Sequence, residues 1–374
     1  MGVRQQRRAA AARAPPPSRA FRRFAGGAAV AQNEIRSALS VVDDSGRPGN
    51  FGWSRRPAFF YDPALVWAPR RRIFEADRYL AFSPTHTVAF ELRDDGWLGY
   101  MGVTVASRRE KKRSTSAIQS LLPLGSFGLP PSSQSGQARY RRRGAALDFV
   151  PMEGGARIIR ADIPRTGDSR GIRGELVLTE PEGGASESIV CNLPWRSDGS
   201  AFRCSRRSPW YTAEGVVQFG TTEIVFAKGN SWGVFDWGRG VRPRADTRYW
   251  ACACGLGAGG RLVGFSVGHG CEDASCGTEN AFFADGRLHK LDQITFHIPP
   301  ADWLSPWSFT SNDNRLEMTF SPRQQRSDGG RALFHSFARR QFFGSFSGRA
   351  VLDDGCEVSF SNVTGFAERV KTRL

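Results

Sequence analysis

Charged and polar side chains that could carry out acid–base chemistry lie in two stretches that otherwise resemble β-strands. The first stretch, residues 277–292, carries Glu279, Asn280, His289, Lys290 and Asp292, and the second, residues 235–240, carries Asp236 and Arg239. Burying such groups in strands costs several kcal/mol per group unless they are paired. Each stretch therefore indicates either a functional site or a structural ion-pair cluster.

The Asp285-Gly286 pair predicts a two-residue hairpin turn, because that turn needs positive φ at both central residues. In this register Glu279 lies opposite Asp292, with Lys290 within diagonal reach on the same face. Two facing carboxylates repel each other unless one keeps its proton or a cation lies between them. Such an arrangement can separate a general acid from a base. A purely structural Glu–Lys–Asp cluster at a sheet edge would explain the same pattern.

Two further groups are candidates on chemical grounds. Asp236 and Arg239 could form a buried bidentate pair, or Arg239 could instead contact an anionic ligand. His269 follows a strand-like run, and it is either a general base or an ordinary histidine of a surface loop. The predicted catalytic residues are Glu279, Asp292 and His289, and the predicted binding residues are Asp236, Arg239, Asn280, Lys290 and His269.

Neither a metal nor a cofactor is expected. Four thiols, Cys252, Cys254, Cys271 and Cys276, are close in sequence, but their spacing differs from that of ordinary structural zinc sites. Residues two apart in a strand also share a face and commonly pack as small apolar groups. The glycine-rich run at residues 255–260 follows a strand without opening a helix, which is typical of a loop rather than a dinucleotide cradle.

The net charge of +16 invites a nucleic-acid interpretation, yet seven of the arginines lie in residues 1–33, which contain no acid. The others form short loop clusters without a recognised nucleic-acid motif, so no nucleic-acid partner is expected. Peripheral contact with an anionic membrane surface stays open. No apolar run approaches the ~20 residues needed to span a bilayer. Residues 1–33 are expected to be a disordered tail or a transit peptide, with a mitochondrial or other organellar location, and otherwise a cytoplasmic one.

The dominant local signal is the β-hairpin. Asp-Gly turns at Asp95, Asp285 and Asp354 separate alternating apolar runs. Further strands are expected at residues 174–178, 221–226, 232–235, 249–254, 262–267, 295–298 and 315–320. The best helix candidate is Ser114–Leu121. The sequence therefore predicts an all-β chain with two antiparallel barrels or sandwiches, residues 34–215 and 216–374, and little helix.

Several motifs in order along the chain resemble the domain of unknown function 2804 family. They are Asn33–Ile35, Asp94–Tyr100, Leu124-Gly125, Leu129-Pro130, Asp236–Gly240, Gly277–Asn280, Gly286–Leu291, Phe343–Gly348 and Gly365–Glu368. This family is in turn distantly similar to the tandem-lipocalin group of carotenoid hydratases and lipocalin-like cyclases. The resemblance implies two lipocalin-like barrels side by side and an apolar cavity for isoprenoid- or polyketide-like molecules.

Two hypotheses about function follow. The chain is either a metal-free acid–base enzyme (a hydratase, isomerase or cyclase) acting on an apolar, isoprenoid- or lipid-like substrate, or a non-catalytic lipid-binding or scaffold protein that uses the same cavity. The partner in both cases is an apolar small molecule or lipid. Whether the predicted catalytic residues point into the cavity distinguishes the two hypotheses.

Overall fold

The computed structural model describes residues 32–110, 113–164, 170–181, 186–195, 198–270, 272–332 and 335–374. Within these ranges most residues lie in antiparallel β-strands, which are connected by loops and by three short 3-10 turns at Arg70–Arg72, Glu153–Gly155 and Ala258–Gly260. A parallel pair, β1 (Leu39–Ser40) and β3 (Phe59–Phe60), lies outside the main sheets. No helix in this part of the chain is long and apolar enough to cross a membrane.

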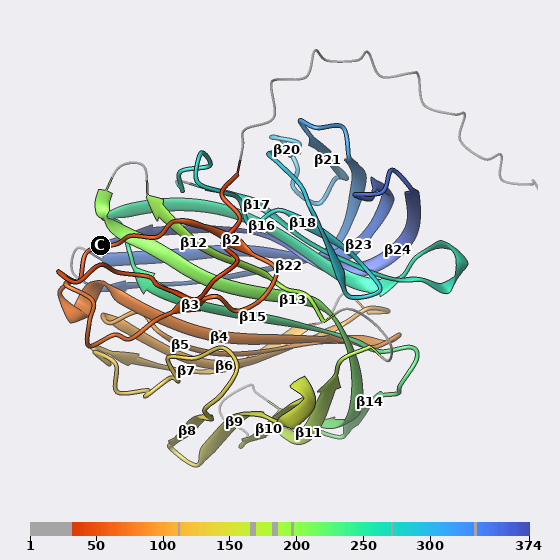
Figure 1. Cartoon of the computed structure of the whole chain (residues 1–374). Helices are drawn as coiled ribbons and strands as arrows, with labels where there is room; N and C mark the ends of the chain where they lie inside the picture. The colour runs from red at the N-terminus through yellow and green to blue at the C-terminus, as the bar shows by residue number, and fades with distance from the viewer. Residues whose placement is uncertain are drawn as a thin grey trace, which may run out of the picture.

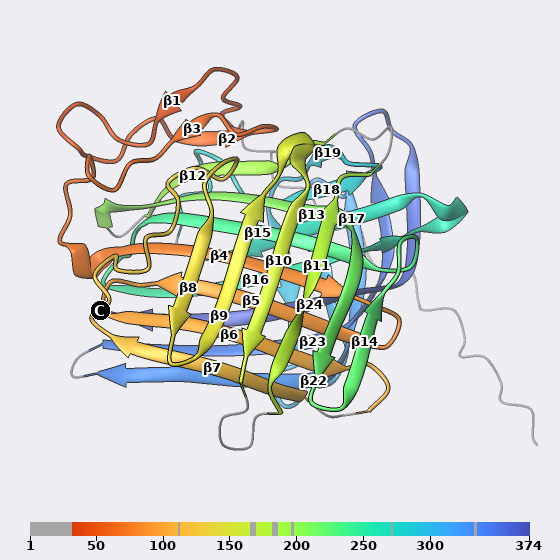
Figure 2. The same cartoon turned by 90° about the horizontal axis from the view of Figure 1, so that it is seen from below.

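A 13-stranded sheet forms most of the N-terminal half, in the order β7-β6-β5-β4-β15-β13-β11-β10-β9-β8, with β12, β14 and β2 attached beside it. Its strands are β2 Gly52–Ser54, β4 Ile73–Phe82, β5 His86–Asp94, β6 Leu98–Ser107, β7 Arg113–Leu121, β8 Ala138–Arg142, β9 Ala145–Pro151, β10 Arg157–Ile163, β11 Ile172–Thr179, β12 Ile189–Trp195, β13 Asp198–Phe219, β14 Thr222–Phe226 and β15 Trp232–Val241. In Figure 2, strands β8 to β11 cross the direction of β4 to β7, so the sheet folds back over itself.

The long strand β13 is the element at which the first sheet folds back over itself. Its first part pairs with β12 and β15, its second part pairs with β11 and β14, and the register shifts between Ser208 and Tyr211. Pro209 lies at this irregularity, where it cannot donate a ladder hydrogen bond. One strand therefore belongs to both layers and brings its early residues, including Arg203 and Arg207, against the second sheet.

The second sheet has nine strands in the order β19-β18-β17-β16-β24-β23-β22-β21-β20. Their bounds are β16 Ala245–Leu256, β17 Leu262–His269, β18 Ala281–Ala284, β19 Arg287–Lys290, β20 Ile294–His297, β21 Trp307–Ser311, β22 Leu316–Ala332, β23 His335–Val351 and β24 Glu357–Arg373. This sheet curls around an aromatic cluster that includes Phe309, Phe320 and Phe346. Figure 1 shows it above the layer formed by β4, β13 and β15.

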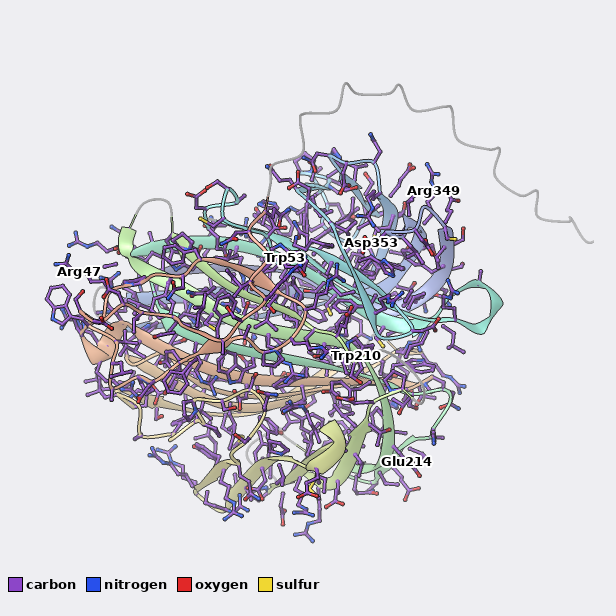
Figure 3. All side chains as sticks on the ribbon, viewed as in Figure 1. Arg47, Trp53, Trp210, Glu214, Arg349 and Asp353 are labelled. Atoms are coloured by element: carbon purple, nitrogen blue, oxygen red, sulfur yellow. The ribbon has the colours of Figure 1, made fainter. Side chains whose placement is uncertain are left out.

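The two sheets share a core. One apolar cluster contains Leu80 and Val88 from the first sheet together with Trp250 and Phe366 from the second. The side chains fill the space between the layers, with Trp53 and Trp210 near the middle of the molecule (Figure 3). Because this apolar surface is continuous across the seam, the halves pack as one body.

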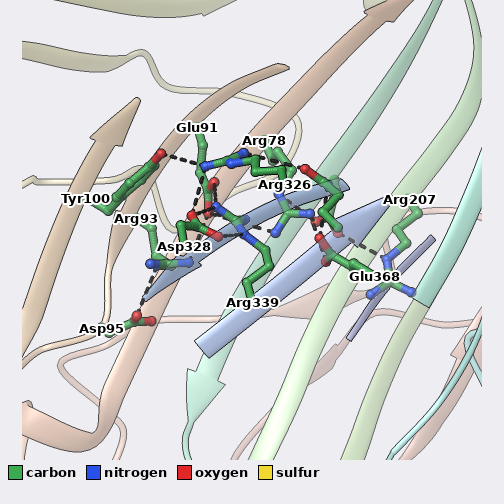
Figure 4. A network of polar contacts seen from close by, with 12 residues as sticks. Arg78, Glu91, Arg93, Asp95, Tyr100, Arg207, Arg326, Asp328, Arg339 and Glu368 are labelled. Carbon is green, nitrogen blue, oxygen red and sulfur yellow. Dashed lines mark hydrogen bonds and ion pairs between the residues drawn. The ribbon is translucent and has the colours of Figure 1, made fainter. Parts of the chain in front are cut away.

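A buried network of charged groups also crosses the seam (Figure 4). Arg78 of β4 pairs with Glu368 of β24 at 3.0 Å, and Arg339 of β23 pairs with Glu91 of β5 at 2.9 Å. Arg326 of β22 donates to the hydroxyl of Tyr100 at 2.7 Å. Buried ion pairs add little stability compared with apolar packing, but removing one partner is costly. The network therefore fixes how the sheets are placed against each other.

The predicted all-β class is confirmed. All three Asp-Gly hairpins form, and Asp285 (φ 50°) and Gly286 (φ 75°) have the predicted positive φ. At the other two hairpins only the glycine, Gly96 or Gly355, has positive φ, so the expected positive φ at both turn residues is wrong there. The helix expected at Ser114–Leu121 is wrong, because these residues form β7 and pair with β6. The short apolar pattern of β7 is compatible with a helix or a strand. The segment forms a strand because the edge of β6 is available for pairing.

Two expected boundaries can be compared with the sheets. The division of the chain at residues 215 and 216 stays a prediction, although the change of sheet falls later, between Val241 and Ala245, since β14 and β15 pair within the first sheet. The expected N-terminal tail covered residues 1–33, of which residues 1–31 lie outside the described residues. Gln32 and Asn33 already bond to the fold: Gln32 donates to Asp292, and Asn33 donates to Phe51 O.

Candidate functional site

A pocket of about 480 Å³ lies where β12 meets one end of the second sheet. Its wall comprises Leu193 from β12, Arg248 from β16, Gly268–Gly270, Glu272, Ala274, Gly277–Asn280, and Gln293–Phe296 around β20. The volume suits a small ligand, and the lining combines apolar groups with a few charged ones, as ligand sites commonly do. Three of the predicted site residues, Glu279, Asn280 and His269, line this pocket.

Glu279 is held by three side chains of β13. Arg203 Nε lies 3.3 Å from its Oε1, Ser205 Oγ donates to the same oxygen at 2.5 Å, and Arg207 Nη1 lies 2.8 Å from Oε2. Residues 203, 205 and 207 share one face of the strand because side chains alternate along it. Burial alone would raise the pKa of Glu279, but the two guanidinium groups and the hydroxyl hold it well below its usual range. Glu279 is thus an ionised anchor.

The predicted pairing of Glu279 with Asp292 is wrong, although the hairpin register itself is confirmed from Ala281↔Lys290 to Ala284↔Arg287. Asp292 lies outside the pocket lining and instead accepts hydrogen bonds from Gln32 at 2.8 Å and Asn312 at 2.7 Å. The hairpin ladder ends before Glu279. Beyond it, the Glu279 carboxylate pairs with the arginines of β13, whereas Asp292 would repel it.

Lys290 also differs from the prediction, since it is not in contact with Glu279. Its Nζ donates to Thr278 Oγ1 at 2.7 Å, Asn280 O at 3.0 Å and Leu291 O at 2.5 Å. Burial is the main reason that the pKa of Lys290 is lowered to about 7. Lys290 lies behind the pocket wall and ties down the backbone on both sides of Glu279.

Glu272 is the group that the sequence analysis did not single out. It lines the pocket, and its Oε1 is buried with no hydrogen-bond partner among the described residues. Burial and the negative charge of Glu279 raise its pKa to about 7. The pocket therefore contains one ionised carboxylate and one carboxyl group that is half protonated near neutral pH, which is the separation that acid–base chemistry requires.

Arg248 was likewise missed. It is 8% exposed, lines the pocket, and its Nη1 is buried without a hydrogen-bond partner in the part of the chain that the structure describes. For the β13 residues a sequence signal existed, because Arg203, Ser205 and Arg207 are spaced two apart in a strand-like run and must share a face. For Glu272 and Arg248 no local pattern separates them from ordinary loop and strand charges.

The other predicted residues in the pocket have defined places. His269 stacks on Tyr249 at 4.8 Å between ring centroids and meets the Phe296 ring edge-on at 5.1 Å. This desolvation lowers the pKa of His269 below its ordinary value, so the ring is mostly neutral at pH 7. Asn280 accepts from Gly268 N at 2.7 Å and donates to Asp292 O at 2.7 Å, which joins β17 to the end of the hairpin.

Besides Asp292 and Lys290, three more predicted residues lie outside the pocket lining. His289 Nδ1 accepts from Asp353 N at 3.0 Å, and burial lowers its pKa. Asp236 and Arg239 do not pair with each other, because they stand three residues apart in β15 and point to opposite faces. Asp236 pairs with Arg207 at 3.0 Å. Arg239 is fully buried against Asp77 at 2.8 Å and backbone carbonyls, so it cannot contact a ligand as proposed.

The cysteines near the pocket do not assemble a metal site in the described residues. Cys252 and Cys254 are buried in β16, where burial raises the pKa of both thiols, and Cys276 is half-buried. Cys271 lies outside the described residues. No group of three or more His, Cys, Asp or Glu side chains in the described ranges is arranged to hold a metal ion.

Residues 32–374 match the sequence profile of a domain of unknown function, DUF2804. The chain belongs to the DUF2804 family. No significant match was found among curated proteins. The family membership predicted from the motifs is therefore confirmed over nearly the whole chain.

This DUF2804 protein also resembles solved structures. The structure of CghA has a TM-score of 0.52 and 11% identity, and the match covers 93% of this chain and 97% of that one. The structure of CghA with Sch210972 has a TM-score of 0.50 and 11% identity, covering 81% and 89%. Kievitone hydratase from Nectria haematococca, at a TM-score of 0.44, 9% identity and coverage of 80% and 88%, is too distant to support an argument. At such identities the similarity shows the fold alone.

Proposed function

We propose that this DUF2804 protein is an acid–base enzyme that transfers protons to and from an apolar small molecule in the pocket, with Glu272 as the proton donor. The observation that carries the proposal is the presence of two glutamates with opposite pKa shifts in the wall of one pocket. A pKa of about 7 for Glu272 is near the value at which general acid catalysis is most effective.

In this proposal each of the pocket residues has a defined role. The protonated Glu272 gives its proton to an unsaturated substrate, and the carboxylate that remains takes a proton back from an added water or from another substrate carbon. Glu272 is then protonated again, as it was before the reaction. The proton taken from water completes a hydration, and the proton taken from another substrate carbon completes an isomerisation. Glu279 keeps its charge and positions the wall. Leu193, Ile294 and Phe296 contact the apolar part of the substrate.

Glu279, one of the predicted catalytic residues, is not the proton donor in this proposal, because its carboxylate is ionised and bound by Arg203, Ser205 and Arg207. The alternative function, a lipid carrier without turnover, uses the same apolar wall. The two functions differ in whether a proton from solvent appears in the product, and this difference can be measured directly.

The test is metabolite profiling in D2O. The wild type, Glu272→Gln and the control Glu214→Gln, which changes an exposed glutamate of β13, are incubated with a small-molecule extract of the cells that make the protein. We expect the wild type and the control to convert a metabolite into a deuterium-labelled product. We expect Glu272→Gln to lose about 10²–10⁴-fold in rate while the same metabolite still binds.

Two results would contradict the proposal. One is full turnover by Glu272→Gln, which would remove this residue as the acid. The other is a wild-type protein that binds a metabolite, detected by native mass spectrometry, and releases it without labelling. That second result would establish the carrier function instead.

A further inference from the structure

The pocket wall contains one cationic group that the protein leaves unsatisfied. Arg248 lines the pocket, and its Nη1 is buried and has no hydrogen-bond partner in the described ranges. A buried polar group without a partner costs about 1–3 kcal/mol, and a charged one costs more. Arg207 also has a buried Nη2 without a partner among the described residues, but its Nε and Nη1 pair with Asp236 and Glu279, whereas no ion pair is formed by Arg248 in these ranges. A ligand that supplies an acceptor to Arg248 would remove this penalty.

The charges around the pocket also indicate what kind of acceptor fits. Arg203, Arg207 and Arg248 all act on the carboxylate of Glu279, Asp236 offsets part of their charge, and Glu272 carries only part of a charge near neutral pH. Burial, and next the charge of Arg248, lower the pKa of Arg203 to about 10. Guanidinium groups therefore crowd one another here, and one added negative charge would relieve this repulsion.

Glu272 supplies a second donor. Its Oε1 has no partner among the described residues, and in its protonated form the carboxyl can donate an O–H to the ligand. A guanidinium N–H and a carboxyl O–H in one pocket suit an oxygen that carries one negative charge. A phosphate dianion fits less well, because Glu279 and the ionised form of Glu272 would repel its second charge. Leu193, Ile294 and Phe296 provide apolar contact for the rest of the molecule.

We infer that the pocket binds an apolar molecule that carries a single anionic oxygen, a carboxylate or the enolate of a conjugated carbonyl, with that oxygen at Arg248. The inference rests on the proposed function, and it specifies the type of proton transfer that the pocket supports. Cationic walls disfavour a carbocation and stabilise negative charge that develops on oxygen. The proton transfer then belongs to the enolising type, as in the isomerisation or hydration of a carbonyl-conjugated double bond.

The binding should depend on pH in a defined sense. The groups facing Glu272 are Arg248 and Asp246 on β16, His269 at the end of β17, and Glu279. As pH rises through about 7, Glu272 loses its proton, becomes negative and stops donating. Affinity for an anionic ligand therefore falls through this range, whereas affinity for a neutral analogue changes little.

The experiment is a binding titration with matched probes. Decanoate and 2-naphthoate are each compared with their methyl esters, and inorganic phosphate is the third probe, with isothermal titration calorimetry on the full chain below and above pH 7. We expect at least one carboxylate to bind about tenfold or more tightly than its ester below pH 7. We expect phosphate not to bind, because it has no apolar part to contact Leu193, Ile294 and Phe296 and its dianion above pH 7 is repelled by the glutamates. Arg248→Met should abolish the preference for the carboxylate, and Arg248→Lys should restore part of it.

Arg349→Met is the control, since Arg349 is exposed on β23 (Figure 3), where it pairs with Glu317 of β22 and Glu357 of β24. Equal affinity of the wild type for acid and ester, no binding of either carboxylate, or an unchanged preference in a folded Arg248→Met would each overturn the inference. The comparison of acid with ester in the wild type stands even if the variant fails to fold. A wild type that prefers carboxylates but labels no metabolite in D2O would refute the proposed function and leave this inference intact.

Discussion

Replacing Glu279 by glutamine is the sharpest test of how the pocket is built. The substitution keeps the shape of the side chain and removes the charge that Arg203 and Arg207 share. If Glu279 were the catalytic acid, the variant would be stable and inactive. Because the structure makes it the anchor of a buried ion-pair cluster, we expect the main effect on stability instead.

The magnitude follows from the contacts. Removing one partner of a buried ion pair costs about 3–5 kcal/mol, because it leaves an uncompensated charge. Here Arg207 keeps Asp236 at 3.0 Å, and the glutamine oxygen can still accept from Ser205. We therefore expect the lower end of the range, a loss of about 3 kcal/mol in the free energy of unfolding at neutral pH.

The pH dependence gives an independent check. The pKa of Glu279 is lowered in the folded state, so its stabilising contribution is present above the unfolded-state pKa of about 4.3 and is lost as pH falls through the folded-state value. The difference in stability between the wild type and Glu279→Gln should be largest near neutral pH and should shrink below about pH 4.

Urea unfolding followed by tryptophan fluorescence measures both effects, since Trp250 lies 4.3 Å from the Arg207 guanidinium and reports on this region. Glu214→Gln provides the matched control, an exposed glutamate on the same strand (Figure 3). If Glu279→Gln unfolds within about 0.5 kcal/mol of the control at neutral pH, which is the range of ordinary surface substitutions, the ion-pair account of Glu279 is wrong.

Three further predictions concern stability. The pKa of Glu272 is raised in the folded state, so ionising this residue destabilises the fold. As pH rises from about 4.3 through about 7, the wild type should therefore lose about 1–3 kcal/mol in the free energy of unfolding relative to Glu272→Gln, measured by urea unfolding. A constant difference across this range would contradict the raised pKa. Arg78→Met removes the 3.0 Å partner of the fully buried Glu368 and should lower the free energy of unfolding by about 3–5 kcal/mol, whereas a loss below about 1 kcal/mol would show that the network does not hold the sheets. Deleting residues 2–31 should leave the melting temperature nearly unchanged, and extending the deletion through Asn33 should lower it, because Gln32 bonds to Thr278 and Asp292; equal melting temperatures would contradict these contacts.

Much of the architecture could be predicted because it depends on local chemistry. The Asp285-Gly286 turn needs positive φ at two adjacent positions, and this requirement sets the register of β18 against β19 without reference to the rest of the chain. Alternating apolar residues around Asp-Gly turns likewise indicate antiparallel strands. Ser114–Leu121 shows the limit of such patterns, since the open edge of β6 rather than its own sequence makes it a strand.

The site depended on contacts that no local pattern contains. Glu279 meets Arg203 and Arg207 because β13 bends across both layers and brings residues more than seventy positions away against the hairpin. The pKa of Glu279 is lowered because these two guanidinium groups outweigh the burial, and the hairpin pattern alone did not contain them. Arg239 was expected to pair with Asp236 or to contact an anionic ligand, and it is instead buried and paired with Asp77.

The sequence by itself determined the family, the all-β class and the local hairpin geometry, since these follow from motifs and from backbone preferences of neighbouring residues. Only the tertiary structure decided which acid keeps its proton. Glu272 and Glu279 are the same residue type seven positions apart, and both are buried. Burial and the negative charge of Glu279 raise the pKa of Glu272, whereas Arg207 and Arg203 outweigh burial and lower the pKa of Glu279.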